Sequence, residues 1–127
     1  MHLKKVLASF LLTVFLLSIT AMTNAQISLF TEIVNKSNTP SNRSPKTDIT
    51  PELLRYIPIG SPLEMAKTVL LANGFTVRIS HANGKNYLTG SREINRSLLG
   101  FEEARLSMTV VNDKVATGSG SIFRQTL

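Results

Sequence analysis

One helix with marked ends constrains the fold of this chain more than any other feature of its sequence. Ser61 is an N-cap residue type, Pro62 follows at the first helical position, and Glu64 comes three residues after Ser61. This spacing predicts a capping box, in which the Ser61 hydroxyl accepts the N–H of Glu64 and the Glu64 carboxylate accepts the N–H of Ser61. Proline at the first position costs nothing, because its missing N–H would have no acceptor within the helix. The helix is therefore expected to begin at residue 62.

The other end of this helix is marked by Asn73-Gly74. Glycine adopts left-handed backbone angles without a steric penalty, so the pair predicts a Schellman motif in which Phe75 folds back against Leu70. Leu71 lies among the polar residues, and we interpret it as an exposed leucine; the alternative is that a partner or the N-terminal segment covers it. The apolar stripe that is expected to face the core consists of Leu63, Ala66, Val69 and Leu70, widened by Met65 and Ala72.

After the helix the hydrophobic period changes from 3.6 to 2, which is typical of a strand. Phe75, Val77 and Ile79 alternate with polar residues, so a half-buried strand is expected there. Asn83-Gly84 predicts a type I′ hairpin turn, and a two-residue loop at this point places Ile79 opposite Leu88. The apolar residues of this hairpin are expected to face the helix.

A second hairpin is predicted from Ala104 to about Gln125. Its first strand alternates, with Leu106, Met108 and Val110 on one face, and Asn112-Asp113 forms the turn that places Val110 opposite Val115. The second strand contains the small residues 117–121, which predict an edge position or a bulge. Residues 90–101, between the two hairpins, are expected to form a long loop with a binding edge.

The N-terminal residues 1–25 have the pattern of a secretory signal peptide: a basic start, a nearly continuous apolar run from Val6 to Ile19, and small residues before a cut after Ala25. The alternative is an uncleaved anchor, but the apolar run is short for a bilayer span of about 20 residues, so no stable span is expected after cleavage. The chain contains no cysteine. Export without disulfides indicates a bacterial periplasmic or secreted protein.

Residues 26–50 are expected to be a short apolar segment followed by a flexible polar linker. The apolar part, up to Val34, has three interpretations: an edge strand, a helical turn, or a segment that docks on the domain. Residues 35–50 are almost entirely polar or proline and contain no aromatic residue, which is typical of a linker. A short helix or turn is predicted from Pro51 to about Tyr56, ended by Pro58. Residues 51–127 are thus expected to form a small α+β domain, with one or two helices packed on one face of a four-stranded antiparallel sheet made of two hairpins.

The sequence predicts no catalytic residue, metal site or cofactor. His81 is the single histidine of the chain after residue 25, and neither Asp48 nor Asp113 is spaced to complete a triad with it. Metal ligands are too few, since cysteine is absent and the acidic residues show no repeated spacing. The net charge of +6 falls to +4 without Lys4 and Lys5, and the cations are not interleaved with aromatics, so nucleic-acid binding is not expected.

A recognition patch is predicted on the outer sheet face from Arg78, Tyr87, Thr89 and Arg105, because tyrosine and arginine are the types that anchor interfaces. We therefore expect a non-enzymatic exported domain that binds a protein or an envelope component through this face and residues 90–101. The alternative is a small periplasmic hydrolase or ligand-binding enzyme that uses His81. A third hypothesis, a secreted inhibitor of a foreign enzyme, differs from the first only in its partner.

The helix from Ile59-Gly60 to Phe75, followed by antiparallel strands in an exported small protein, resembles small envelope domains of the SmpA/OmlA (BamE) type and the beta-lactamase-inhibitor-like type. In those domains one or two helices that begin after a glycine pack on a short antiparallel sheet. The resemblance covers residues 51–125 and lies in the order of elements; it implies the architecture and no functional residue. The chain departs from the lipoprotein members, since it has no cysteine to lipidate.

Overall fold

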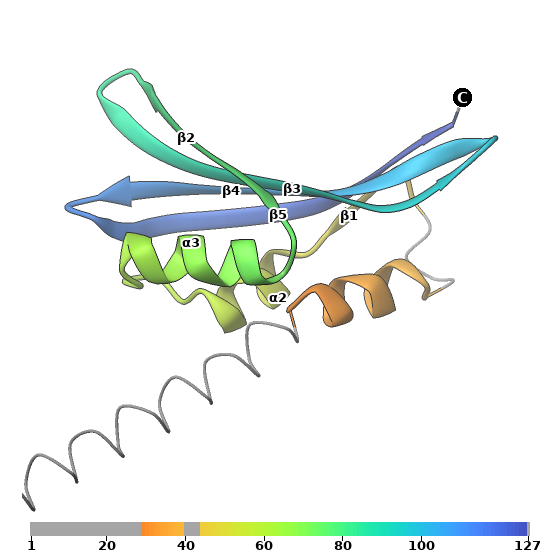
Figure 1. Cartoon of the computed structure of the whole chain (residues 1–127), viewed down its shortest axis with the longest axis horizontal. Helices are drawn as coiled ribbons and strands as arrows, with labels where there is room; N and C mark the ends of the chain where they lie inside the picture. The colour runs from red at the N-terminus through yellow and green to blue at the C-terminus, as the bar shows by residue number, and fades with distance from the viewer. Residues whose placement is uncertain (1–28, 40–43, 127) are drawn as a thin grey trace, which may run out of the picture.

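Three helical segments lie on one face of a five-stranded antiparallel sheet in the computed structural model, which describes residues 29–39 and 44–126 (Figure 1). The α+β class and the packing of helices on one sheet face are as predicted. The prediction of four strands is wrong, because the structure has a fifth strand at residues 46–48. The helical segments are residues 29–37, α2 (Thr50–Tyr56) and α3 (Leu63–Ala72). The strands, in the spatial order β1-β5-β4-β3-β2, are β1 (Lys46–Asp48), β2 (Thr76–Ala82), β3 (Lys85–Ser97), β4 (Gly100–Val111) and β5 (Lys114–Thr126).

The predicted capping box of α3 is wrong. The Ser61 hydroxyl donates to the Pro58 carbonyl at 2.5 Å, and the Ser61 carbonyl accepts the N–H of Val115 at 2.9 Å. Pro62 forms an isolated antiparallel bridge with Lys114 at the start of β5, and the first N–H of the helix, that of Leu63, binds the Asp113 carbonyl at 2.8 Å. A backbone carbonyl from a distant turn thus accepts the first N–H of the helix, while the serine hydroxyl binds within the preceding turn.

The predicted C-terminal cap of α3 is confirmed. Gly74 has a φ of +75°, its N–H donates to Leu71 O, and the N–H of Phe75 donates to Leu70 O, both at 3.0 Å. These two bonds define a Schellman motif, and Leu70 and Phe75 are both buried. Leu71 is 59% exposed, so its interpretation as an exposed leucine is confirmed.

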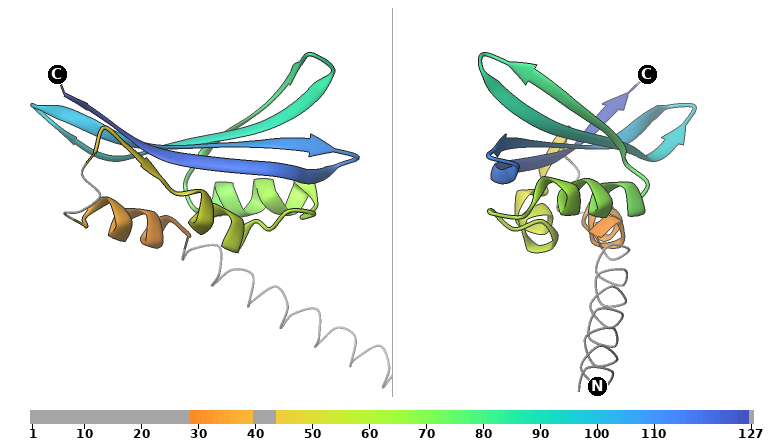
Figure 2. Two further views of the ribbon diagram at one scale, coloured as in Figure 1. Left: turned by 180° about the vertical axis from the view of Figure 1, so that it is seen from behind. Right: turned by 60° about the vertical axis from the view of Figure 1, so that its left-hand side comes forward.

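Both predicted hairpins are present, with the predicted registers. The turns at Asn83-Gly84 and Asn112-Asp113 have positive φ at both central residues, as type I′ requires. Ile79 pairs with Leu88, and Val110 pairs with Val115. The expected burial fails at Ile79, which is 42% exposed, because the β2–β3 hairpin rises away from the helices towards its tip (Figure 2).

Residues 90–101 do not form the predicted loop. β3 continues to Ser97, and β4 starts at Gly100 after a turn at Leu98-Leu99, two leucines that are 98% and 77% exposed. Residues 90–101 do not show the apolar–polar alternation of a strand, because this end of the sheet packs against residues 29–37 through polar contacts as well as apolar ones. One of these joins the Ser37 hydroxyl to the Glu102 carboxylate at 2.5 Å.

The predicted linker over residues 35–50 is wrong where the structure describes it. Residues 29–37 form a docked helix, and Lys46–Asp48 pair with Ser121–Phe123 as the fifth strand. Thr47 and Ile49 are buried, so they belong to the packed unit. A strand of three residues is too short to show a period in the sequence. The predicted signal peptide 1–25 lies outside the described residues, as do positions 40–43.

Two glycines on β5 allow α2 and Ile49 to pack closely against the sheet. Gly118 and Gly120 face inward, and a Cβ on Gly120 would lie 2.6 Å from Leu106 Cδ2. The predicted bulge is present as a register shift beside Thr117, but β5 is not an edge strand, because β1 lies outside it. Within the described part of the chain, no helix is long and apolar enough to cross a membrane. The core comprises residues Leu29, Ile33, Ile49, Leu53, Ile57, Ala66, Val69, Leu70, Phe75, Leu88, Ala104, Leu106, Met108, Val110, Val115 and Ile122.

Candidate binding surface

The sheet face opposite the helices is uncovered and concave. The β2–β3 hairpin curves up at one end of the sheet and the β3–β4 hairpin at the other, while all three helical segments lie below (Figures 1 and 2). Between these ends lies a hollow of about 570 Å³, which we call the concave surface. Its lining residues are Lys46, Thr76, Arg78, Thr89, Gly90, Ser91, Glu103, Arg105, Leu106, Ser107, Ser119, Gly120, Ser121 and Phe123.

Short hydroxyl side chains form the floor of the concave surface. Strand registers place them in rows that cross the sheet, because every second residue of a strand points to the same face. The first row crosses four strands as Arg78, Thr89, Ser107 and Ser119, and the next as Thr76, Ser91, Arg105 and Ser121. Since serine and threonine are small, the floor stays low and the longer charged side chains stand above it.

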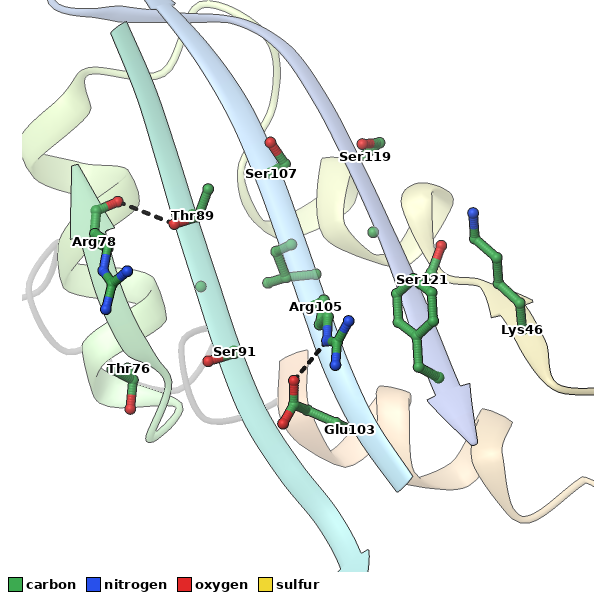
Figure 3. Close-up of a pocket in the computed structure, with 14 residues that line it drawn as sticks. Lys46, Thr76, Arg78, Thr89, Ser91, Glu103, Arg105, Ser107, Ser119 and Ser121 are labelled. Carbon is green, nitrogen blue, oxygen red and sulfur yellow. Dashed lines mark hydrogen bonds and ion pairs between the residues drawn. The ribbon is translucent and has the colours of Figure 1, made fainter. Parts of the chain in front are cut away.

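Three cations and one carboxylate stand on this floor. Arg78 on β2 and Lys46 on β1 lie at opposite sides, with Arg105 between them on β4 (Figure 3). Arg105 Nε lies 2.7 Å from Glu103 Oε1. Among residues 29–39 and 44–126, no carboxylate pairs with the Arg78 guanidinium. The surface therefore has an excess of positive charge.

Phe123 holds two of these cations in place. Its ring centroid lies 4.7 Å from Arg105 Cζ and 5.4 Å from Lys46 Nζ, distances at which the negative face of the ring attracts a cation. Arg105 is thus oriented by a ring on β5 and a carboxylate on its own strand. Arg78 has neither kind of contact among the described residues, and it is exposed.

The structure brings together three of the four predicted patch residues. Arg78, Thr89 and Arg105 line the concave surface, and Thr89 Oγ1 donates to the Arg78 carbonyl at 3.3 Å. Tyr87 lies on the same face one pair further along, opposite Ser80 and outside the lining of the hollow. The predicted binding edge in residues 90–101 is replaced by paired strand.

Sequence reasoning missed Lys46, Glu103 and Phe123. Lys46 stood in the predicted linker, so no pattern placed it on the sheet. The outward direction of Phe123 follows from alternation with the buried Ile122, a signal that was present in the sequence. Glu103 pairs with Glu93 across β3 and β4, in a stretch whose continuation into the sheet had not been predicted.

His81 lies exposed near the tip of the β2–β3 hairpin, with its Nδ1 in contact with the side-chain amide of Asn86. Its side-chain partner is therefore an amide and not the carboxylate of a Ser-His-Asp triad. Asp48 is on β1, at the opposite edge of the sheet, and Asp113 is in the turn of the other hairpin. Over the residues that the structure describes, no group of three or more His, Cys, Asp or Glu side chains gathers to hold a metal ion.

Comparison of the chain with protein-family models, curated proteins and solved structures finds no match. The resemblance to SmpA/OmlA (BamE) and beta-lactamase-inhibitor-like domains therefore stays a prediction. Any function has to be argued from the concave surface and its charges.

Proposed function

We propose that this chain is an exported, non-enzymatic domain that binds an acidic, extended segment of another envelope protein on its concave surface. The observation that carries the proposal is an uncovered sheet face with three cations, one carboxylate and a hydroxyl floor. The signal-peptide pattern of residues 1–25 supports the export of the chain.

The spacing of the cations favours an extended ligand. Arg78, Arg105 and Lys46 are each separated by two strand positions in the sheet order. Neighbouring strands lie about 4.8 Å apart, so successive cations are on the order of 10 Å apart. An extended peptide rises about 3.3 Å per residue and its side chains alternate in direction, so carboxylates two or four residues apart, about 7 or 13 Å, point to the same side and bracket this spacing.

The character of the floor also fits a polypeptide. Serine and threonine hydroxyls both donate and accept hydrogen bonds, so they can bind main-chain N–H and C=O groups of an extended segment. Tyr87, which is half-buried on the same face, offers an aromatic anchor next to the charged region. Arg105, already oriented by Phe123 and Glu103, loses little side-chain freedom on binding.

The test uses a short poly-glutamate peptide as the probe and fluorescence anisotropy as the readout. Charge reversal by Arg78→Glu should weaken binding by about fivefold or more, because it replaces an attraction with a repulsion. Arg55→Glu is the matched control, since it makes the same charge change on α2, on the opposite side of the sheet. Binding should also weaken as salt is raised from 50 to 300 mM, where screening is stronger.

Two results would overturn the proposal. One is equal affinity of the Arg78→Glu and Arg55→Glu proteins for the peptide, which would mean that only net charge matters. The other is equal binding of poly-glutamate and an uncharged peptide of the same length. Circular dichroism of each variant checks that the sheet is intact.

A further inference from the structure

The two edges of the sheet differ in how their backbone groups are satisfied. At the β1–β5 edge, other segments of the chain occupy the outward backbone groups of β5. The Gly60 N–H donates to Val115 O at 2.8 Å, and the Val115 N–H donates to Ser61 O at 2.9 Å. Further along β5, Gly120 O accepts the N–H of Ile49 at 2.9 Å, and Gly120 N–H donates to Thr50 Oγ1 at 3.1 Å. This edge offers few backbone groups to another strand.

The β2 edge has no such protection. Among the described residues, β2 pairs with β3 alone, over seven residues and without a register shift. It contains no proline, and it runs along the outside of a hairpin that projects from the sheet (Figure 2). Natural edge strands are usually short, bulged or interrupted by proline, because an unprotected edge pairs with other strands.

The hairpin turn decides which backbone groups of β2 point outward. A two-residue loop makes Ala82 and Lys85 a hydrogen-bonded pair, and such pairs alternate along an antiparallel ladder. The N–H and C=O groups of Ala82, Ser80 and Arg78 therefore point to β3. Thr89 Oγ1 donates to the Arg78 carbonyl from that side. The outward groups belong to Val77, Ile79 and His81.

We propose that two copies of this chain associate through antiparallel pairing of β2 with β2, with Ile79 opposite Ile79 of the second copy. In this register Val77 lies opposite His81 of the second copy. All outward N–H groups of each strand then meet outward carbonyls of the other, because the three residues are evenly spaced about Ile79. The contact is isologous and closes on itself, as most soluble homodimers do.

The side chains of β2 fit this register. Ile79, which is 42% exposed in the single chain, packs on its own counterpart. On the other face Arg78 lies opposite Ser80 of the second copy, so the two arginines meet only diagonally, about 8 Å apart, where salt screens their repulsion. Like charges directly opposite each other would destabilise the pair, and this register avoids them.

Self-complementarity is what favours a second copy over a foreign strand as the occupant. When β2 pairs with β2 of a second copy, the outward backbone groups match, Ile79 meets Ile79 at the centre, and the two Arg78 side chains are offset. The resulting sheet is continuous, and it joins the concave surfaces of the two copies side by side. The proposal stands independently of acidic-segment binding, because it uses the edge and not the face of the sheet.

The test is sedimentation velocity on protein purified from cells that express the whole chain, with charges introduced at the centre of the pairing. Ile79→Lys and Ile79→Glu should each be monomeric at concentrations where the unchanged protein dimerises, because like charges then face each other. An equal mixture of the two variants should dimerise again. Leu71→Ser, which removes an exposed apolar side chain elsewhere but leaves β2 intact, is the control and should keep the dimer.

Recovery in the mixture is specific to a register in which residue 79 faces residue 79. A monomeric unchanged protein at all accessible concentrations, or a mixture that stays monomeric with both variants folded, would overturn the proposal. If the variants do not fold, hydrogen exchange of the unchanged protein decides. The amides of Val77, Ile79 and His81 should be protected only at concentrations where the dimer forms, and protection in the monomer would point to another occupant of the edge.

Discussion

Replacing Arg124 by alanine should release residues 29–39 and β1 from the sheet. The Arg124 side chain, 16% exposed, donates to Ser44 O and Thr47 Oγ1, each at 2.8 Å. It also donates to Ser37 O at 3.2 Å and pairs with Glu102 Oε2 at 3.2 Å. One side chain thus joins the first helical segment, β1, β4 and β5.

The expected loss of stability from Arg124→Ala is about 3 kcal/mol. Hydrogen bonds to a charged group contribute roughly 1.5–3 kcal/mol each, but water can replace part of them at this partly exposed site. Removing one member of a largely buried ion pair typically costs about 3–5 kcal/mol, which sets the upper end. Domains of this size are stable by about 5–15 kcal/mol, so the change is large enough to measure by urea unfolding.

Arg55→Ala is the matched control for this experiment. Arg55 also makes an ion pair, with Glu32 at 3.0 Å, but its side chain is 59% exposed. Exposed pairs contribute about 0–1 kcal/mol, so this variant should be nearly as stable as the unchanged protein. Arg124→Lys should recover only part of the loss, because an ammonium cannot reach acceptors on several sides at once.

The reasoning would be refuted if Arg124→Ala cost no more stability than Arg55→Ala. A second readout is local: the amide of Ile49, which donates to Gly120 O, should lose hydrogen-exchange protection in Arg124→Ala. Full protection of that amide, together with a small change in stability, would mean that β1 is held by apolar packing alone.

Two further predictions concern the core and the acid limit of stability. Gly120→Val should cost about 1–3 kcal/mol in urea unfolding, because even its Cβ would lie 2.6 Å from Leu106 Cδ2, whereas Ser119→Val on the outer face should change stability by about 0.5 kcal/mol or less. Two hydrogen bonds to the Asp48 carboxylate hold its pKa below the ordinary value of 3.8; the bond from the Thr50 hydroxyl has the larger effect and the bond from the Thr50 N–H the smaller. The stabilisation is therefore present above that value and is lost as the pH falls through the lower folded-state pKa, so Asp48→Asn should flatten the acid side of the stability–pH curve; an unchanged slope would contradict this.

The small residues 117–121 have two roles, which the fold separates by face. Gly118 and Gly120 point inward, where they leave room for α2 and for the side chain of Ile49. Ser119 and Ser121 point outward and form part of the floor of the concave surface. A stretch that indicates a weak strand in the sequence thus permits both the close packing of the helices and the depth of the hollow.

Prediction from the sequence succeeded where the determining contacts are local. The cap at Gly74 depends on residues within one turn of helix, and the turn at Asn83-Gly84 sets the register of its whole hairpin. Alternation along the strands also placed Arg78, Thr89 and Arg105 on one face, and all three line the concave surface.

Prediction failed where a segment is held by residues far away in the chain. Ser61 carries a capping pattern, but its backbone pairs with Val115, and that competing contact decides its conformation. The strand Lys46–Asp48 is too short for a periodic pattern and exists because β5 offers it an edge. Lys46 could not be assigned to the surface for the same reason.

The amino-acid sequence by itself determined the helix α3 with its C-terminal cap, the two type I′ hairpins and the direction of the side chains along them. These follow from backbone preferences and hydrophobic period, which act over a few residues. Only the tertiary structure decided that β1 joins the sheet, that the helix of residues 29–37 packs on it, that one face remains uncovered and that the β2 edge is unpaired among the described residues. Those features depend on which distant segments meet, because burial and strand pairing are satisfied between elements and not within them.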